Sequence, residues 1–259
     1  MSEIPKRRTD RRTPRHYRGT QSAADLQTEP FRIVQAVLPR IVELAGMVAV
    51  FGAAGTGKSF AVDYFIEHAD APNVWLDLPG PPKGKELAIR LLEKLGAECD
   101  RSAPIYALVD DLTDALADFP GIMVVNEAQN SGREGLELLR YCHERPDARW
   151  TLVVIGCGLE KVVGTSRELV SRFNRAVEFH PLTTDEIVPL LQQYHPLFAA
   201  TDPSLLVAWD ERLHGVLREW AKYLEFLLGR PAASRTRPPT ERTFAAFLAA
   251  NVFETGEAT

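Results

Sequence analysis

The residues whose types and spacing are most specific for one chemistry are Gly52-Ala53-Ala54-Gly55-Thr56-Gly57-Lys58-Ser59. They fit the pattern G-x-x-x-x-G-K-[ST], in which the glycines let successive backbone N–H groups point at one anion. The lysine of this pattern reaches the β- and γ-phosphates of a nucleotide, and the final hydroxyl ligates Mg²⁺. A glycine turn with a chance lysine would match the same letters, so the flanking sequence has to decide.

The flanking sequence favours a phosphate-binding loop. The apolar run Met47–Phe51 precedes the loop and predicts a buried strand, and apolar residues at helical spacing follow from Phe60 to Ile66. A helix that begins at the loop adds its positive amino-terminal end to the anion site. We therefore expect the segment from Gly52 to Phe60 to bind ATP, with Lys58 on the phosphates and Ser59 on Mg²⁺.

A second polar pair, Asn126-Glu127, follows the apolar run Ile122–Val125, which predicts another strand. In nucleotide hydrolases with such a loop, the usual pair is Asp followed by Glu. Glu127 is accordingly the predicted general base for an attacking water. Asn126 is the predicted metal-site residue, but its amide brings no negative charge to a dication, so we expect weak Mg²⁺ support and slow hydrolysis. The alternative is an unrelated Glu at a strand end.

Three arginines and one cysteine are further candidates. Arg172, and after it Arg175, precede the last predicted strand, from where an arginine can project into a neighbouring subunit's nucleotide. A surface ion pair is the alternative for both. Arg218 can fold back onto the phosphates or be a plain helix-surface arginine. Cys157 ends the fourth predicted strand, where a polar residue often senses the γ-phosphate, but a thiol is a poor hydrogen-bonding substitute and a packed thiol is the alternative.

Strands and helices alternate from residue 30 to residue 179. A helix is expected to begin near Pro30, with Thr28 close to its cap, and Pro39 is expected to kink or split it. Predicted strands occupy residues 47–51, 72–78, 122–127, 151–155 and 176–179, and helices between them occupy residues 60–66, 86–95, 105–119, 133–143 and 167–174. This alternation predicts an α/β fold with a five-stranded parallel sheet covered by helices on both faces.

Charge and pattern divide the chain further. Residues 1–24 form a basic arm, since positions 1–20 hold seven basic and two acidic residues, which leaves a net charge of −10 for the remainder of a chain whose total is −5. Such an arm can bind a phosphate backbone, or it can be a solvated tail without consequence. Residues 25–182 are the predicted nucleotide-binding domain, residues 183–253 a small helical domain and residues 254–259 a tail.

The remaining totals bound the class of protein. An apolar fraction of 45% is ordinary for a globular chain, and the sequence holds no apolar run of 18 residues that would predict a membrane span. The amino terminus lacks an apolar signal-peptide core, and the three widely spaced cysteines favour a reducing cytosol. We expect a cytoplasmic protein that has no membrane partner and whose cysteines are core thiols.

Together these segments resemble the AAA+ ATPases, in particular the transposon and phage target-selection ATPases typified by MuB, TniB and TnsC. The resemblance implies that Thr28 and Arg218 contribute to the nucleotide site, that Arg172 is an arginine finger, and that the carboxyl-terminal helices form a lid. Asn126 and Cys157 depart from the family pattern, which weakens the expected hydrolysis rather than binding. Besides the phosphate loop, the resemblance rests on Thr28-Glu29-Pro30-Phe31-Arg32, Asn126-Glu127-Ala128-Gln129, Leu169–Phe173 with Pro181-Leu182-Thr183, and Gly215–Trp220.

The family resemblance also implies partners. It implies ATP-dependent assembly of a homo-oligomeric ring or filament on duplex DNA, with a transposase downstream. Lys83 and Lys85 lie in the loop after the second strand, where related proteins approach the DNA backbone, and Arg133 is a further candidate; a solvated basic loop is the alternative. Such phosphate contacts are independent of base sequence. Two other interpretations stay open, namely a helicase-loader or phage-defence ATPase, and an ATP-bound interaction switch that hardly hydrolyses.

Overall fold

The computed structural model describes residues 20–82 and 84–251. Most of the predicted basic arm, Lys83, and the predicted tail at residues 254–259 therefore lie outside the described residues. The described chain divides into two compact units. We call Glu29–Phe179 the core unit, and we call residues 20–28 together with residues 180–251 the helical unit.

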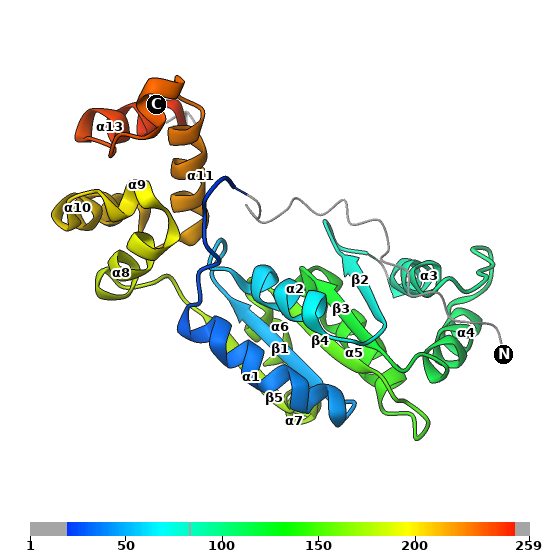
Figure 1. The fold of residues 1–259 in the computed structure, drawn as a ribbon. Coiled ribbons are helices and arrows are strands. Elements are labelled where there is room, and N and C mark those ends of the chain that lie inside the picture. Colours follow the sequence, from blue (N-terminus) through cyan, green and yellow to red (C-terminus); the bar gives the residue numbers. More distant parts are fainter. Residues whose placement is uncertain (1–19, 83, 252–259) are drawn as a thin grey trace, which may run out of the picture. The chain divides into compact units, whose positions relative to one another are not determined.

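The core unit is built around a five-stranded parallel sheet in the order β2-β3-β4-β1-β5 (Figure 1). Its strand ends are in register, since Asp77 pairs with Asn126, Phe51 with Gly156 and Gly52 with Phe179. The carboxyl ends of the strands consequently meet at one edge of the sheet, which confirms the predicted fold class. The strands are β1 (Met47–Gly52), β2 (Asn73–Asp77), β3 (Ile122–Asn126), β4 (Thr151–Gly156) and β5 (Arg175–Phe179).

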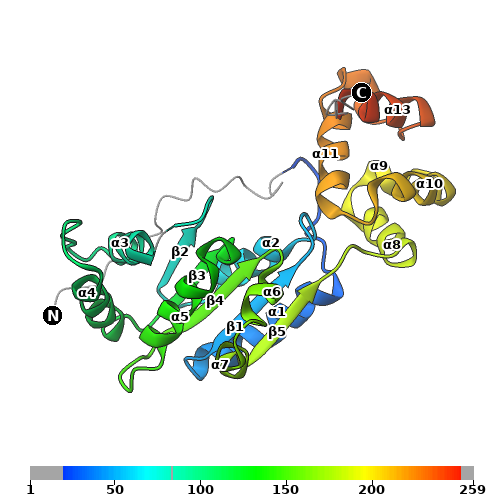
Figure 2. The same ribbon diagram turned by 180° about the vertical axis from the view of Figure 1, so that it is seen from behind.

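Helices cover both faces of this sheet (Figures 1 and 2). Successive strand residues point to opposite faces, so Val48 and Val50 pack with α1 and α2, whereas Met47 and Ala49 belong to the cluster of the opposite face. The helices of the core unit are α1 (Glu29–Glu43), α2 (Lys58–His68), α3 (Gly84–Leu95), α4 (Ile105–Ala117), the 3₁₀ turn η1 (Ala128–Ser131), α5 (Gly132–His143), α6 (Leu159–Val163) and α7 (Arg167–Arg172).

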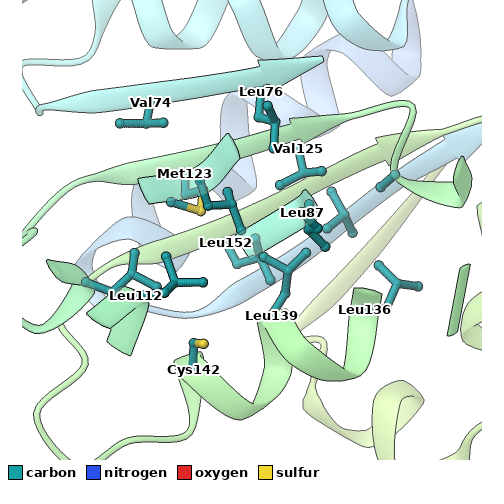
Figure 3. Close-up of a cluster of buried hydrophobic side chains, with 14 of the residues drawn as sticks. Val74, Leu76, Leu87, Leu112, Met123, Val125, Leu136, Leu139, Cys142 and Leu152 are labelled. Atoms are coloured by element: carbon teal, nitrogen blue, oxygen red, sulfur yellow. The ribbon is translucent and has the colours of Figure 1, made fainter. Parts of the chain in front are cut away.

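The second cluster joins the sheet to α3, α4 and α5. Figure 3 shows Met123 and Leu152 from the sheet beside Leu139 of α5. Cys142 belongs to the same cluster, and burial raises the pKa of its thiol to about 11. The thiol therefore stays protonated at neutral pH, in agreement with the core role expected for it.

One prediction about α1 concerned Pro39, which was expected to kink or split the helix. The helix is not split, since α1 runs as one element from Glu29 to Glu43 with Pro39 inside it. Pro39 lies on the exposed face of the helix. The backbone carbonyl that a proline leaves without its helical partner can be solvated there, so the helix continues through it.

The helical unit has its own core of aromatic and aliphatic side chains. Trp209, Trp220 and Tyr223 are almost fully buried, and the rings of Trp209 and Phe244 stack with their centroids 5.1 Å apart. Residues 20–28 join this unit because Ala24 N donates to Tyr194 O at 2.8 Å. Its helices are α8 (Thr184–Tyr194), α9 (Pro196–Ala199), α10 (Pro203–Leu213), α11 (Leu217–Leu228), α12 (Ala232–Arg235) and α13 (Glu241–Asn251).

In the described parts of the chain, no helix is both long and apolar enough to cross a membrane.

Candidate functional site

The loop between β1 and α2 has the backbone geometry that the glycine pattern predicts. Gly52, Gly55 and Gly57 all have positive φ angles, at 124°, 76° and 99°. No residue other than glycine fits at position 52, because a Cβ there would lie 1.9 Å from Phe179 O on the neighbouring strand. Ala53 N donates to that same carbonyl at 3.1 Å, which anchors the start of the loop to β5. The loop is thus fixed to the sheet before α2 begins.

Lys58 is the first residue of α2 and closes the loop on itself. Its Nζ donates to Gly52 O at 3.0 Å and to Ala53 O at 2.5 Å, and the residue is buried. Thr56 Oγ1 also donates to Ala53 O, at 2.8 Å. The carbonyls of Gly52 and Ala53 hold the ammonium group at the start of the loop. Phosphate oxygens, which are stronger acceptors for an ammonium group, would compete for it there.

Ser59, Asn126 and Asp77 form a chain of hydrogen bonds across the carboxyl edge of the sheet. Ser59 Oγ donates to Asn126 Oδ1 at 3.0 Å, and Asn126 Nδ2 donates to Asp77 Oδ1 at 2.8 Å. The predicted metal residues Ser59 and Asn126 are therefore in direct contact. Sequence reasoning missed Asp77, although a carboxylate that ends a predicted strand was a signal that could have found it.

The residues present fit Mg²⁺. This ion prefers oxygen ligands and keeps several of its waters, and a hydroxyl, an amide oxygen and a carboxylate meet these preferences. Within residues 20–82 and 84–251, no group of three or more His, Cys, Asp and Glu residues could hold a metal ion by itself. A Mg²⁺ ion that arrives with a nucleotide is the form of metal binding that this edge of the sheet suits.

Glu127 directly follows β3 and has an unusual backbone. Its φ is 56° and its ψ 39°, a left-handed conformation that is uncommon for a glutamate. The side chain is exposed, and its Oε2 accepts a hydrogen bond from Gln129 Nε2 at 2.7 Å. Strained backbone of this kind tends to cluster at functional sites. The turn leaves an exposed carboxylate directly after Asn126, held by the hydrogen bond from Gln129.

Cys157 lies against the phosphate loop. It follows β4, the strand beside β1, and its Sγ donates to Gly52 O at 3.0 Å. The thiol is half-buried. It shares the Gly52 carbonyl with Lys58, so the thiol lies directly beside the phosphate loop.

Arg172 and Arg175 lie at the amino-terminal end of β5, whereas the phosphate loop lies at the carboxyl ends of the strands. Arg175 begins β5 and pairs with Val48, four residues before Phe179, which is about 13 Å along a strand. Arg172 ends α7, immediately before this strand, and its Nε lies 2.5 Å from Glu144 Oε1. Both side chains are exposed. The structure thus separates these arginines from the phosphate loop of their own core unit.

A network of charged groups supports the helix that carries Arg172. Ser166 caps α7 by accepting from Leu169 N at 3.3 Å, and its Oγ donates to Glu137 Oε1 at 3.1 Å. Hydrogen bonds from Arg140 and, more weakly, from Ser166 hold the pKa of Glu137 below its ordinary value against the opposing effect of burial. Glu137 consequently stays charged at neutral pH, and it ties α5 to the first turn of α7.

Three more predicted site residues lie on or beside the first turns of helices. Phe60 belongs to α2, where its ring centroid lies 5.8 Å from that of Phe31 in α1. Thr28 is buried and directly precedes α1, at the last position of the amino-terminal segment of the helical unit. Arg218 is exposed in the first turn of α11, also in the helical unit.

The described candidates for DNA contact begin two helices on the same face of the sheet. Lys85 is in the first turn of α3, and its Nζ lies 3.5 Å from Ser102 O. Arg133 is exposed in the first turn of α5, with its Nε 3.8 Å from Glu137 Oε1. Both pairings are long, so each cation can exchange its partner for a phosphate at little cost. Lys83 lies outside the described residues.

Residues 42–163 match the family model of an AAA domain. This segment contains the phosphate loop, Asp77, the Asn126-Glu127 pair and Cys157. The chain has the fold of the P-loop AAA+ ATPases. No protein among the curated ones matches the chain in sequence.

Solved AAA+ structures resemble the chain over most of its length. The ORC2 protein of Aeropyrum pernix, in ADPNP and ADP complexes, matches with a TM-score of 0.66 and 16% identity over 92% of this chain and 71% of that chain. Cdc6p from Pyrobaculum aerophilum matches with a TM-score of 0.67 and 14% identity over 86% and 67%. The Holliday junction branch migration motor RuvB of Thermotoga maritima matches with a TM-score of 0.56 and 15% identity over 89% and 72%.

Proposed function

We propose that this protein is an ATP-dependent AAA+ ATPase that binds duplex DNA without sequence preference, oligomerises on it, and regulates target selection in transposition together with a transposase. The observation that carries the proposal is the convergence of Lys58, Ser59, Asn126 and Glu127 at the carboxyl edge of one sheet, beside the loop that begins at Gly52. This set contains a phosphate cradle, a set of oxygen ligands for Mg²⁺ and a base.

The chemistry that this set supports is hydrolysis of the γ-phosphate. The loop N–H groups and Lys58 bind the phosphates, and Glu127 takes a proton from the attacking water while the bond to the β-phosphate oxygen breaks. A bound Mg²⁺ would neutralise the negative charge that develops on the phosphate oxygens. The products are ADP and inorganic phosphate. Gln129 holds the carboxylate of Glu127 in place for the proton transfer.

Assembly from several subunits would complete the site. Arg172 and Arg175 lie at the sheet edge opposite the loop, so they are suited to reach the nucleotide of a neighbouring subunit and not their own. ATP bound between subunits then favours the oligomer, and hydrolysis releases it. Thr28 and Arg218 are proposed to touch the nucleotide when the lid closes.

DNA binding is proposed from charge and from the resemblance to target-selection ATPases. The basic residues at positions 1–20, with Lys83, Lys85 and Arg133, can contact phosphates without reading bases. One structurally similar protein, RuvB, is a Holliday junction branch migration motor. The transposase partner and a cytoplasmic location rest on the resemblance and on the sequence composition. Pull-down of a helicase in place of a transposase would support the helicase-loader reading.

The experiment for the nucleotide site compares Lys58→Ala with Lys94→Ala, a control at an exposed lysine in the last turn of α3. Binding of a fluorescent ATP analogue should weaken about 30-fold or more in Lys58→Ala, because a buried charged partner is lost. The control should bind like the wild type. Equal affinity in Lys58→Ala and the wild type would remove the loop from the site.

The second experiment decides between an ATPase and an interaction switch that binds ATP and hardly hydrolyses it. The uncharged Asn126 favours the interaction switch. Glu127→Gln keeps the shape of the side chain but removes its basicity, so phosphate release should fall about 100-fold or more while ATP affinity is kept. If the wild type already releases phosphate no faster than Glu127→Gln, with and without DNA, the protein is a switch that binds ATP and does not turn it over.

A further inference from the structure

Asp77 lies beside the proposed nucleotide site but belongs to neither the phosphate loop nor the Asn126-Glu127 pair. It is the last residue of β2 and the register partner of Asn126 on β3. Its Oδ1 accepts two hydrogen bonds, from Asn126 Nδ2 at 2.8 Å and from Trp75 Nε1 at 3.0 Å. The side chain is exposed, whereas Asn126 is buried. A carboxylate therefore stands one hydrogen bond away from the residue at which a metal-site charge is missing.

This contact also fixes which way the Asn126 amide points. An ionised carboxylate can only accept hydrogen bonds, so the amide must turn its NH₂ group towards Asp77. The amide oxygen is then left for the other side, where Ser59 Oγ donates to it at 3.0 Å. Ser59, Asn126 and Asp77 thus form a polarised series that ends on a negative charge. An asparagine without Asp77 could rotate and present its NH₂ group to a cation.

We propose that Asp77 supplies the negative charge that Asn126 lacks, and that it holds the Asn126 amide oxygen towards the Mg²⁺ that accompanies ATP at Ser59. Asp77 is in this sense a positioning residue. It acts on the metal by orienting Asn126 and by the electrostatic attraction of its own negative charge. The inference rests on the proposed binding of ATP with Mg²⁺ at this edge of the sheet. It revises the expectation of weak Mg²⁺ support, because the negative charge that is absent from Asn126 on β3 is present on Asp77 of the neighbouring strand β2.

A purely structural role for Asp77 makes a different prediction. Its bonds to Trp75 and Asn126 tie the ends of β2 and β3 together, and such a role would change stability without regard to Mg²⁺. Asp77→Asn keeps the size of the side chain and an oxygen that can accept from Trp75 Nε1. It removes only the charge and the fixed direction of the amide pair. The response of ATP affinity to Mg²⁺ therefore separates the two roles.

The measurement is the affinity of a fluorescent ATP analogue, titrated over Mg²⁺ concentration and repeated in EDTA, together with the melting temperature. In Asp77→Asn the affinity in Mg²⁺ should fall about 10- to 100-fold, the range known for partners that orient metal ligands. The affinity in EDTA should not fall, because removing a negative charge relieves repulsion of the triphosphate. Asp110→Asn, at an exposed position on α4, is the matched control and should behave as the wild type.

The reciprocal exchange gives a second and independent readout. Asn126→Asp alone sets two carboxylates at the distance of a hydrogen bond, which repel each other, so it should lower the melting temperature in EDTA. The double variant Asp77→Asn/Asn126→Asp restores one charge and one amide. Its Mg²⁺-dependent affinity should return to within about threefold of the wild type, as coupled neighbours do in a double-mutant cycle.

The outcomes separate this inference from the proposed function. Wild-type protein that does not bind the ATP analogue contradicts the proposed function, and this inference with it. Wild-type protein that binds with Mg²⁺ dependence, while Asp77→Asn shows the same dependence, overturns the role of Asp77 alone. A double variant no better than Asp77→Asn also overturns it.

Discussion

Arg172 forms an ion pair with Glu144, with 2.5 Å between the arginine Nε and Oε1 of the carboxylate. Their side chains are 54% and 31% exposed, and a pair of this kind stabilises a protein by about 0 to 1 kcal/mol. The surface ion pair and the arginine finger were alternative readings of the sequence. The two alternatives are compatible, because so weak a bond would let Arg172 exchange Glu144 for the phosphate oxygens of a nucleotide on a neighbouring subunit, as proposed above.

Replacement of Arg172 is the prediction that follows. Arg172→Ala should keep ATP affinity within about twofold and lose roughly 1000-fold in DNA-stimulated phosphate release, the effect of a missing arginine finger. Arg167→Ala, an exposed position on the same helix, is the control. Mixing Arg172→Ala with Lys58→Ala subunits should restore part of the activity, because each supplies what the other lacks. A mixture as inactive as its components would show that Arg172 does not act across subunits.

Salt dependence tests the proposed contacts with DNA. Each cation that neutralises a phosphate contributes about 0.9 to the slope of log affinity against log salt concentration. Lys85→Ala and Arg133→Ala should each reduce that slope by roughly one and weaken binding equally for unrelated sequences. Lys94→Ala serves as the control. A slope unchanged in both variants would mean that Lys85 and Arg133 do not contact the DNA backbone.

The backbone at Gly215 explains why the two segments of the family resemblance in the helical unit occur together. Gly215 O accepts from Leu182 N at 3.0 Å, and Gly215 has a φ of 68°. A Cβ at this position would lie 1.9 Å from Leu182 O. Asp210 Oδ1, which is buried, accepts from Gly215 N at 3.1 Å and from Trp220 Nε1 at 2.9 Å. The start of α11, which carries Arg218, is therefore fixed to the segment before α8.

Gly215→Ala should consequently destabilise the helical unit by about 2 kcal/mol or more, through both strain and overlap. Hydrogen exchange of peptides from residues 180–251 in the full chain measures this locally, and it should show faster exchange there than in residues 29–179. Gly229→Ala is the matched control, since a Cβ there meets its nearest atoms at an ordinary 3.5 Å. Equal protection in both variants would mean that the contact with Leu182 does not support this unit.

Acid sensitivity should follow from His143. Burial lowers the pKa of this imidazole against the opposing effect of the Ala45 carbonyl, to which its Nε2 bonds at 2.9 Å. Near pH 6.5 this imidazole takes up a proton in the unfolded chain but stays neutral in the folded chain. Its contribution to the free energy of unfolding is therefore full above that pH and falls as the pH drops below it. The free energy of unfolding in urea should decrease between pH 7.5 and 5.5 by up to about 1.4 kcal/mol per pH unit for this proton.

His143→Gln should flatten that decrease, while His180→Gln, at an exposed position, should leave it unchanged. His195 adds to the same trend, because burial lowers its pKa as well. The same slope in His143→Gln and the wild type would assign the acid sensitivity to other groups.

Much of this arrangement could be predicted from local patterns. The strand before Gly52, the helix after it and the pair Asn126-Glu127 each depend on residues adjacent in sequence, and the sheet with helices on both faces follows from their alternation. The contact between Asp77 and Asn126 could not be predicted, because it depends on which strands are neighbours across 49 positions of the chain. That α1 continues through Pro39 could not be predicted either, because the cost of a proline inside a helix depends on its exposure. The ion pair of Arg172 depends on how α7 lies against the end of α5.

The most direct test of the account is the binding of a fluorescent duplex of random sequence, followed by anisotropy with ATP, with ADP and without nucleotide. The account predicts that ATP strengthens binding at least about tenfold over both other conditions, that binding weakens steeply as salt rises, and that Lys58→Ala loses the effect of ATP. Equal affinity for DNA in all three conditions, in a protein that binds ATP, would contradict it.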